Sequence, residues 1–344
     1  MRPPFTIGGV EVPAGERRLV DLPVSKLANH TPVTLPVHIL HGPRDGPAMF
    51  VSAAIHGDEL NGVEIIRRLL RTIQPANIAG TMLCVPIVNA HGFIGRSRYL
   101  PDRRDLNRCF PGSPTGSLAA RLAHLFLTEV VHRCQFGIDL HTAAVHRVNL
   151  PQIRSAFSRR ARSRELAEAF GTQVVVDSPE RQGSLRKSAR EAGVDVLVYE
   201  GGEGLRFDEF AITAGVVGIT NVMLKTRMLQ LPERETPPAN TVRPPVFANA
   251  STWVRAPESG IFRTSKRIGE AVGEGELIGF VANPYEDSEA VIRAPKRGLI
   301  VGRTTLPVVN MGDALFHLAW SEEISTARTG KAPADPLMDE DEII

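Results

Sequence analysis

The stretch Ala48-Met49-Phe50-Val51-Ser52-Ala53-Ala54-Ile55 runs directly into His56-Gly57-Asp58-Glu59, so a nearly continuous apolar run ends in a group of polar side chains. An apolar run of this kind is typical of a strand that is buried on both faces of a parallel sheet. From Glu59 to Ile73, apolar side chains recur at helical spacing with arginines opposite them, which predicts an amphipathic helix. The stretch therefore predicts a strand, loop and helix unit of an α/β fold.

The same alternation of strand and helix continues on both sides of this unit. We expect strands at residues 36–40, 82–88, 137–140, 173–176 and 194–199, and helices at residues 118–133, 159–170, 183–192 and 208–229. This order of elements predicts an αβα sandwich.

A proline-rich segment, Pro232 to Pro245, has no periodicity and marks a boundary between two domains. We expect a first domain over residues 1–235, a linker over 236–248, a small β-domain over 249–325 and a disordered tail over 326–344. In the β-domain, Ala256-Pro257-Glu258-Ser259-Gly260 recurs as Ala294-Pro295-Lys296-Arg297-Gly298. This weak repeat predicts an all-β sandwich or barrel made of two similar halves.

Composition excludes several classes of partner. The 344 residues carry 40 basic and 38 acidic side chains, a formal net charge of +2, so neither nucleic acid nor a membrane is expected as the main partner. No apolar run reaches the roughly 18 residues that a membrane span requires, and no signal peptide precedes the first domain, so we expect a cytoplasmic protein. Cys84, Cys109 and Cys134 lack the spacing of a disulfide framework or a cysteine metal site.

Two polar motifs follow predicted strands and are expected at one edge of the sheet. His56 and Glu59 have the His-x-x-Glu spacing, and His141 follows the strand at residues 137–140. Two histidines and one carboxylate with an open fourth position are the usual ligands of a hydrolytic zinc ion. By itself, His-x-x-Glu fits an acidic helix start beside a surface histidine better than a metal site, and the motifs that accompany it reverse this preference.

Further polar residues accompany these motifs. The loop containing Arg98-Tyr99 and Asp105-Leu106-Asn107-Arg108 is too polar for a core segment and suits a pocket that grips a carboxylate, although a solvated arginine-rich loop has the same composition. Glu200 follows the strand at residues 194–199 and precedes Gly201-Gly202. Such a glutamate can be a solvated strand end, but its place at the same sheet edge as His56 and His141 favours a general base. Asp139 either orients a ligand or caps a turn, and Asp58 is similarly undecided.

Taken together, these motifs resemble the succinylglutamate desuccinylase and aspartoacylase family, which is related in fold to the zinc carboxypeptidases. The resemblance covers roughly residues 45–225 and rests on the order His-Gly-Asp-Glu, Arg-Tyr, Asp-Leu-Asn-Arg, Asp-Leu-His-Thr and Glu-Gly-Gly. It implies a mixed sheet, a catalytic first domain that includes the N-terminal strands, and one zinc ion per chain. It also implies a role for each matched residue: His56, Glu59 and His141 as zinc ligands, Arg98 as the group that polarises the scissile carbonyl, Asn107 and Arg108 as the pair that binds the substrate carboxylate, and Glu200 as the general base.

Two features depart from the family pattern. The β-domain resembles a lipoyl or biotinyl module, but its central hairpin, Tyr285-Glu286-Asp287-Ser288-Glu289, has no lysine to carry the group. The family's second substrate-binding arginine has two candidates here, Arg186 and Arg190, of which Arg186 is favoured.

The sequence thus predicts a zinc-dependent hydrolase that cleaves the amide bond of a small N-acylated amino acid or amine. A zinc carboxypeptidase acting on peptides is an alternative with the same ligands and base. A non-catalytic zinc-binding interaction protein is an alternative of another class. The acyl group, the amine and any homo-oligomeric assembly are left open by the sequence.

Overall fold

The apolar stretch at residues 48–55 contributes to β5 (Arg44–Ala53), a strand with parallel neighbours on both sides. The structure is a computed structural model that describes residues 2–230 and 244–321. The chain divides into two compact units, residues 1–249 and 250–344. The part of the predicted linker at residues 236–243 and the predicted tail lie outside the described residues.

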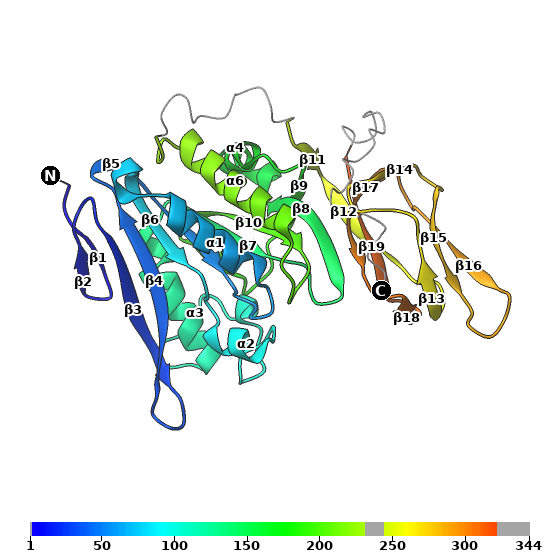
Figure 1. Cartoon of the computed structure of the whole chain (residues 1–344), viewed down its shortest axis with the longest axis horizontal. Coiled ribbons are helices and arrows are strands. Elements are labelled where there is room, and N and C mark those ends of the chain that lie inside the picture. Colours follow the sequence, from blue (N-terminus) through cyan, green and yellow to red (C-terminus); the bar gives the residue numbers. More distant parts are fainter. Residues whose placement is uncertain (1, 231–243, 322–344) are drawn as a thin grey trace. The chain divides into compact units, whose positions relative to one another are not determined.

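The first unit is built on a large mixed sheet with the strand order β11-β9-β8-β10-β7-β5-β6-β4-β3 (Figure 1). β6, β5, β7 and β10 run parallel to one another, whereas β8 is antiparallel to β10 and β4 is antiparallel to β6. A separate hairpin joins β1 (Phe5–Ile7) and β2 (Val10–Val12). The other strands are β3 (Arg17–Lys26), β4 (Pro32–His41), β6 (Ala79–Val85), β7 (Phe136–His141), β8 (Arg147–Ser155), β9 (Val174–Asp177), β10 (Asp195–Gly202) and β11 (Val246–Ala248).

Helices cover both faces of this sheet, as predicted for an αβα sandwich (Figure 1). α1 (Asn61–Thr72), α4 (Ala161–Phe170) and α6 (Glu209–Lys225) pack on one face, and their apolar sides form one core with the strands. α3 (Leu118–Glu129) and α5 (Leu185–Glu191) pack on the other face in a second core. The short α2 is Ala90–Gly95, and single 3-10 turns lie at Pro75–Asn77, Leu106–Arg108, Val131–Arg133 and Phe157–Arg159.

Strand β8 is not among the predicted strands. Its sequence mixes Asn149, Pro151, Gln152 and Arg154 with apolar residues, so it shows neither strict alternation nor a continuous apolar run. Asn149 and Gln152 are nevertheless buried. The ladder between β8 and β10 shifts register around Pro151, which has no N–H to donate.

Several predicted boundaries differ from the structure, and two of these differences affect the site and the end of the first unit. Glu59 lies before α1 instead of in its first turn, because its backbone N–H closes a turn on the carbonyl of His56 (3.1 Å) and the helix begins at Asn61. Residues 246–248, which the sequence assigns to the linker, form β11 and pair in parallel with β9. Val246 and Phe247 are apolar enough to extend the sheet, and Phe247 is buried in its core.

The described part of the second unit is built from strands. One sheet pairs β12, β19, β17 and β14, and another pairs β16, β15, β13 and β18 around a shared apolar core. The strands are β12 (Ala250–Arg255), β13 (Gly260–Arg263), β14 (Ala271–Val272), β15 (Leu277–Ala282), β16 (Glu289–Arg293), β17 (Gly298–Thr304), β18 (Val308–Val309) and β19 (Ala314–Trp320).

The weak sequence repeat corresponds to a reciprocal pairing inside this unit. Ala256 exchanges backbone hydrogen bonds with the turn at Gly312 and Asp313, at 2.9 and 2.8 Å. Ala294 does the same with the turn at Gly275 and Glu276, at 2.8 and 2.9 Å. Each half therefore holds the glycine turn of the other half, which explains why the same Ala-Pro phrase and the same glycine turns recur.

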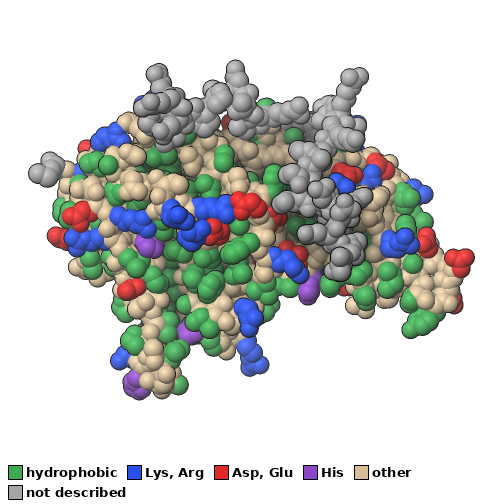
Figure 2. All heavy atoms as spheres, in the orientation of Figure 1, with side chains coloured by type: hydrophobic (Ala, Val, Ile, Leu, Met, Phe, Trp, Pro, Cys, Tyr) green, Lys and Arg blue, Asp and Glu red, His purple; other side chains and the backbone are tan. Residues whose placement is uncertain are grey.

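Neither basic nor acidic side chains dominate the face drawn in Figure 2. Figure 2 shows basic side chains beside acidic ones, consistent with a formal net charge of +2. Within residues 2–230 and 244–321, the helices lack the combination of length and apolar character that crossing a bilayer requires.

Candidate active site

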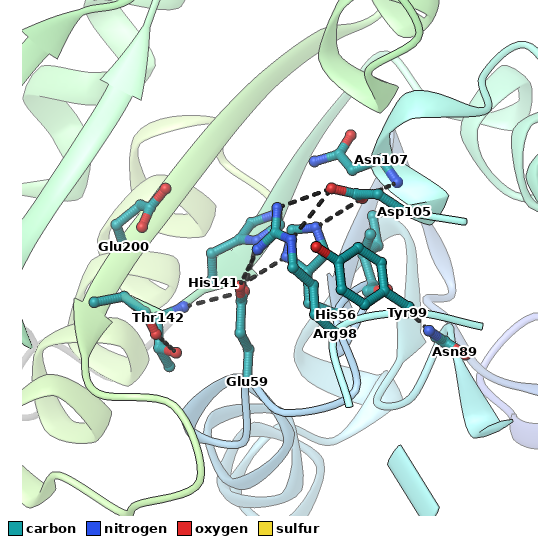
Figure 3. Close-up of polar contacts among 12 residues, drawn as sticks. His56, Glu59, Asn89, Arg98, Tyr99, Asp105, Asn107, His141, Thr142 and Glu200 are labelled. Atoms are coloured by element: carbon teal, nitrogen blue, oxygen red, sulfur yellow. Dashed lines mark hydrogen bonds and ion pairs between the residues drawn. The ribbon is translucent and has the colours of Figure 1, made fainter. Parts of the chain in front are cut away.

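The structure brings together the three predicted ligands at the carboxyl ends of β5 and β7. One donor atom each from His56, Glu59 and His141 lies within 4.8 Å of the other two, and all three residues are buried. Glu59 lies between the imidazoles, with its two oxygens each 2.7 Å from a ring Nδ1 atom. The backbone N–H of Thr142 also donates to this carboxylate at 3.3 Å (Figure 3).

Local backbone geometry explains how the His56 loop reaches this position. Ala54 has a positive φ of 51°, which turns the chain sharply at the end of β5. Gly57 then packs against the backbone of Gly92, where any Cβ atom would overlap the peptide. A glycine between His56 and Asp58 therefore permits the close approach of α2 to the loop.

Each imidazole is held from behind by a second carboxylate. His56 Nε2 lies 3.1 Å from Asp105 Oδ1, and His141 Nε2 lies 2.8 Å from Asp139 Oδ2. In each ring the Nε2 atom therefore faces an aspartate, and the Nδ1 atom faces Glu59. Carboxylates in this position fix the tautomer and orientation of metal-binding histidines.

The electrostatics of the cluster follow from this arrangement. Burial alone would lower the pKa of His141, but the carboxylates of Asp139 and Glu59 hold that pKa well above its usual value. The pKa of His56 is raised in the same way by Glu59 and Asp105. In return, the two imidazoles hold the pKa of Glu59 well below its usual range despite complete burial.

Arg98 contacts two carboxylates of the cluster. Its Nε and Nη2 atoms donate to Asp105 Oδ2 at 3.2 and 3.0 Å, and its Nη1 atom lies 3.4 Å from Glu59 Oε1. Burial raises the pKa of Asp105, but His56 and Arg98 outweigh it and leave this pKa well below the usual range. Asp105 thus links the arginine to a predicted metal ligand, a role that the sequence prediction does not assign to it.

Glu200 lies at the end of β10, directly beside His141 in the register of the parallel pair β10 and β7 (Figure 3). Its carboxylate is held by two residues of β8. Asn149 Nδ2 donates to Oε2 at 2.9 Å, and Arg154 Nε lies 3.5 Å from Oε1. Sequence reasoning misses both of these residues because it does not identify β8 as a strand.

The predicted carboxylate-binding residues lie in two places. Asn107 joins the loop to α5, because its Oδ1 accepts from the backbone N–H of Leu185 at 2.9 Å. Arg108 is exposed and donates to the carbonyl of Asn107 at 2.6 Å, so the structure does not bring it to the buried cluster.

Arg186, on α5, is anchored by one terminal nitrogen. Nη2 donates to the carbonyls of Ser178 and Pro179 at 2.9 and 3.1 Å. Nη1 is buried and has no hydrogen-bond partner among the residues that the structure describes. Burial lowers the pKa of Arg186, and the charges that act on it include that of Glu200. The alternative arginine, Arg190, instead forms an ion pair with Glu180.

Comparison with known proteins identifies the class to which this fold and site belong. The model of the succinylglutamate desuccinylase/aspartoacylase catalytic domain matches residues 45–225. The chain is 26% identical over 293 residues to the N-alpha-acetyl-L-2,4-diaminobutyric acid deacetylase of Halomonas elongata, covering 80% of this chain and 82% of that protein.

Solved structures agree with this match. A succinylglutamate desuccinylase/aspartoacylase from Rhodobacter sphaeroides superposes with a TM-score of 0.77 at 25% identity, over 88% of this chain and 95% of that one. The product-bound ectoine utilization protein EutE (DoeB) from Ruegeria pomeroyi shares the fold, with a TM-score of 0.78 at 21% identity over 93% and 100% of the two chains. The protein is thus of the deacylase class. It belongs to the succinylglutamate desuccinylase/aspartoacylase family, which confirms the resemblance seen in its sequence.

Proposed function

We propose that this protein is a zinc-dependent deacylase that hydrolyses the amide bond of a small N-acylated amino acid or amine. The observation that carries the proposal is the convergence of His56, Glu59 and His141 within 4.8 Å, beside Glu200. The deacetylase relative supports an acetyl group as the first acyl group to test. The proposal keeps the cytoplasmic location and the small-molecule partner predicted from the sequence.

The residues present fit a zinc ion. Two imidazole nitrogens and a carboxylate form the ligand set of many hydrolytic zinc sites, which leave a fourth position open. Three carboxylates surround the two imidazoles, those of Glu59 and Asp139, which are buried, and that of Asp105, which is partly buried. A divalent cation would offset this concentration of negative charge. Zinc bound there would lower the pKa of a water ligand to about 7 and polarise the acyl carbonyl.

Glu200 is the proposed general base. Its carboxylate contacts Asn149 and Arg154 but, among the described residues, neither imidazole nor Arg98, so it can receive a proton from the attacking water. The same carboxylate would return that proton to the nitrogen of the leaving amine. Asn149 and Arg154 keep it at the end of β10 while it does so.

Arg98 is the proposed stabiliser of the negative charge that develops on the acyl oxygen. Its guanidinium is tethered to Asp105 and lies against Glu59, which orients it in advance. Removing one such stabilising group typically costs ~3 kcal/mol, about a hundredfold in rate.

Substrate anchoring is assigned to Asn107, Arg108 and Arg186. Arg186 has the strongest support, because its buried Nη1 atom has no partner among the described residues and an anionic substrate group would supply one. Arg108 would have to leave the carbonyl of Asn107 to bind the substrate.

For the second unit, whose two halves pair reciprocally, we keep the lipoyl- or biotinyl-like fold as a proposal.

The experiment is an assay of the purified full chain on N-acetyl, N-succinyl and N-formyl derivatives of amino acids and diamines, together with short peptides and a zinc analysis. We expect about one zinc ion per chain, loss of hydrolysis with a chelator, and recovery when zinc is returned. Cleavage of peptides in preference to the small amides would favour the carboxypeptidase alternative. Zinc binding without hydrolysis of any compound would favour the non-catalytic one.

A further inference from the structure

A buried chain of three side chains crosses from β5 to β7 behind the proposed metal site. Ser52 and Asp139 are direct neighbours in the register of these parallel strands. Ser52 Oγ donates to Asp139 Oδ1 at 2.7 Å, and Asp139 Oδ2 lies 2.8 Å from His141 Nε2. Each oxygen of this carboxylate therefore has one side-chain partner.

Because Ser52 and Asp139 are buried, the serine hydroxyl should affect the orientation of the carboxylate. Ser52 is 0% exposed and Asp139 is 1% exposed, so bulk water does not reach the contact between them. A buried carboxylate oxygen that loses its donor bears a desolvation penalty, and the group reorients to reduce that penalty. Any rotation of Asp139 moves the acceptor that holds His141 in place.

The two imidazoles differ in how their second carboxylates are supported. Asp105, behind His56, accepts from the guanidinium of Arg98 and from the backbone N–H of Asn107 at 2.8 Å. Asp139, which contacts His141, has Ser52 as its other side-chain donor among the described residues. Loss of one donor therefore leaves Asp105 with another donor that is not an imidazole, whereas loss of the Ser52 hydroxyl leaves Asp139 with His141 as its side-chain partner among the described residues.

We infer that Ser52 is a positioning residue that orients His141 through Asp139 and thereby strengthens zinc binding. The inference rests on the proposed function, because it concerns the same metal site. Ser52 also lies on the strand that leads into His56, so one residue links the strands that present both imidazoles. Partners behind a ligand typically change metal affinity about 10–100-fold, and the expected loss for Ser52→Ala is about tenfold.

The test compares zinc dissociation constants, measured by competition with a chromogenic chelator, for the full-length wild type and its variants. Ser155→Ala is the matched control, because Ser155 is also buried in the sheet, on β8, and its hydroxyl has no hydrogen-bond partner among the described residues. Asp139→Asn is combined with Ser52→Ala in a double-mutant cycle. Ser52→Thr retains the hydroxyl and serves as the second variant if Ser52→Ala does not fold.

We expect Ser52→Ala to weaken zinc binding about tenfold, Ser155→Ala to leave it unchanged, and Ser52→Ala to add no further loss once Asp139→Asn is present. Ser52→Thr should retain more affinity than Ser52→Ala. Wild-type affinity in Ser52→Ala, an equal loss in Ser155→Ala, or additive losses in the cycle would each overturn the inference. In those cases the wild type still binds zinc and hydrolyses amides, whereas a wild type that does neither refutes the proposed function itself.

Discussion

Asn149 on β8 donates a hydrogen bond of 2.9 Å to Glu200 on β10, so the proposed general base is held by the neighbouring antiparallel strand. A hydrogen bond to a charged group contributes about 1.5–3 kcal/mol. We expect Asn149→Ala to lower kcat about tenfold, with zinc content unchanged and KM little altered, because the base loses its orientation and the metal ligands do not. Steady-state kinetics with metal analysis measure this, and Asn29→Ala, at an exposed loop position, is the control.

Replacing the base and replacing a ligand should have separable effects. Glu200→Gln keeps the shape of the side chain but cannot take a proton, so we expect retained zinc and a loss of turnover of about 10²–10⁴-fold. His141→Ala removes one of the three ligands and should lose both zinc and turnover. Metal analysis of each purified variant beside its activity gives the comparison. Full activity in either variant would contradict the mechanism.

Asp105 supports two parts of the site at once, because it accepts from Arg98 and holds His56. Asp105→Asn should therefore weaken zinc binding about 10–100-fold and should also lower kcat when zinc is saturating. Titrating activity against free zinc separates the two effects. If excess zinc restored the full wild-type kcat, Arg98 would not depend on Asp105 for its position.

The stability of the first unit should depend on the ionisation of Glu64 on α1. Hydrogen bonds from Arg67 at 2.5 Å and Arg68 at 2.8 Å lower the pKa of Glu64 to about 2. Because the folded-state pKa is lowered, the stabilisation is complete above the unfolded-state pKa of about 4.3 and is lost as the pH falls toward the folded-state value.

Glu64→Gln should therefore lower the unfolding temperature at pH 7, and its difference from the wild type should shrink between pH 5 and pH 3. The effect should be small and should decrease with added salt, because the partners of Glu64 lie near the surface. Thermal unfolding at several pH values measures it. A difference that stays constant down to pH 3 would show that the ion pairs do not contribute.

How far the sequence predicts the site depends on where each residue lies. His56, Glu59, His141 and Glu200 follow apolar strands, so their meeting at one sheet edge follows from the topology of a parallel sheet. The supporting residues could not be predicted in this way. Asn149 belongs to a strand whose buried polar side chains obscure the strand pattern. Ser52 is a polar residue in an apolar run, but the sequence does not indicate which side chain it contacts.

The sequence by itself determined the alternation of helices with the apolar strands, but not β8 or β11, because apolar runs and helical spacing depend on residues that are near one another in the chain. It also identified the family, because the motifs occur in the family's order along residues 45–225. Only the tertiary structure decided which carboxylate stands behind each imidazole, how β8 supports Glu200, and which nitrogen of Arg186 is left without a partner among the described residues. Those contacts depend on register and on side-chain direction between strands and loops, which packing of the whole domain sets.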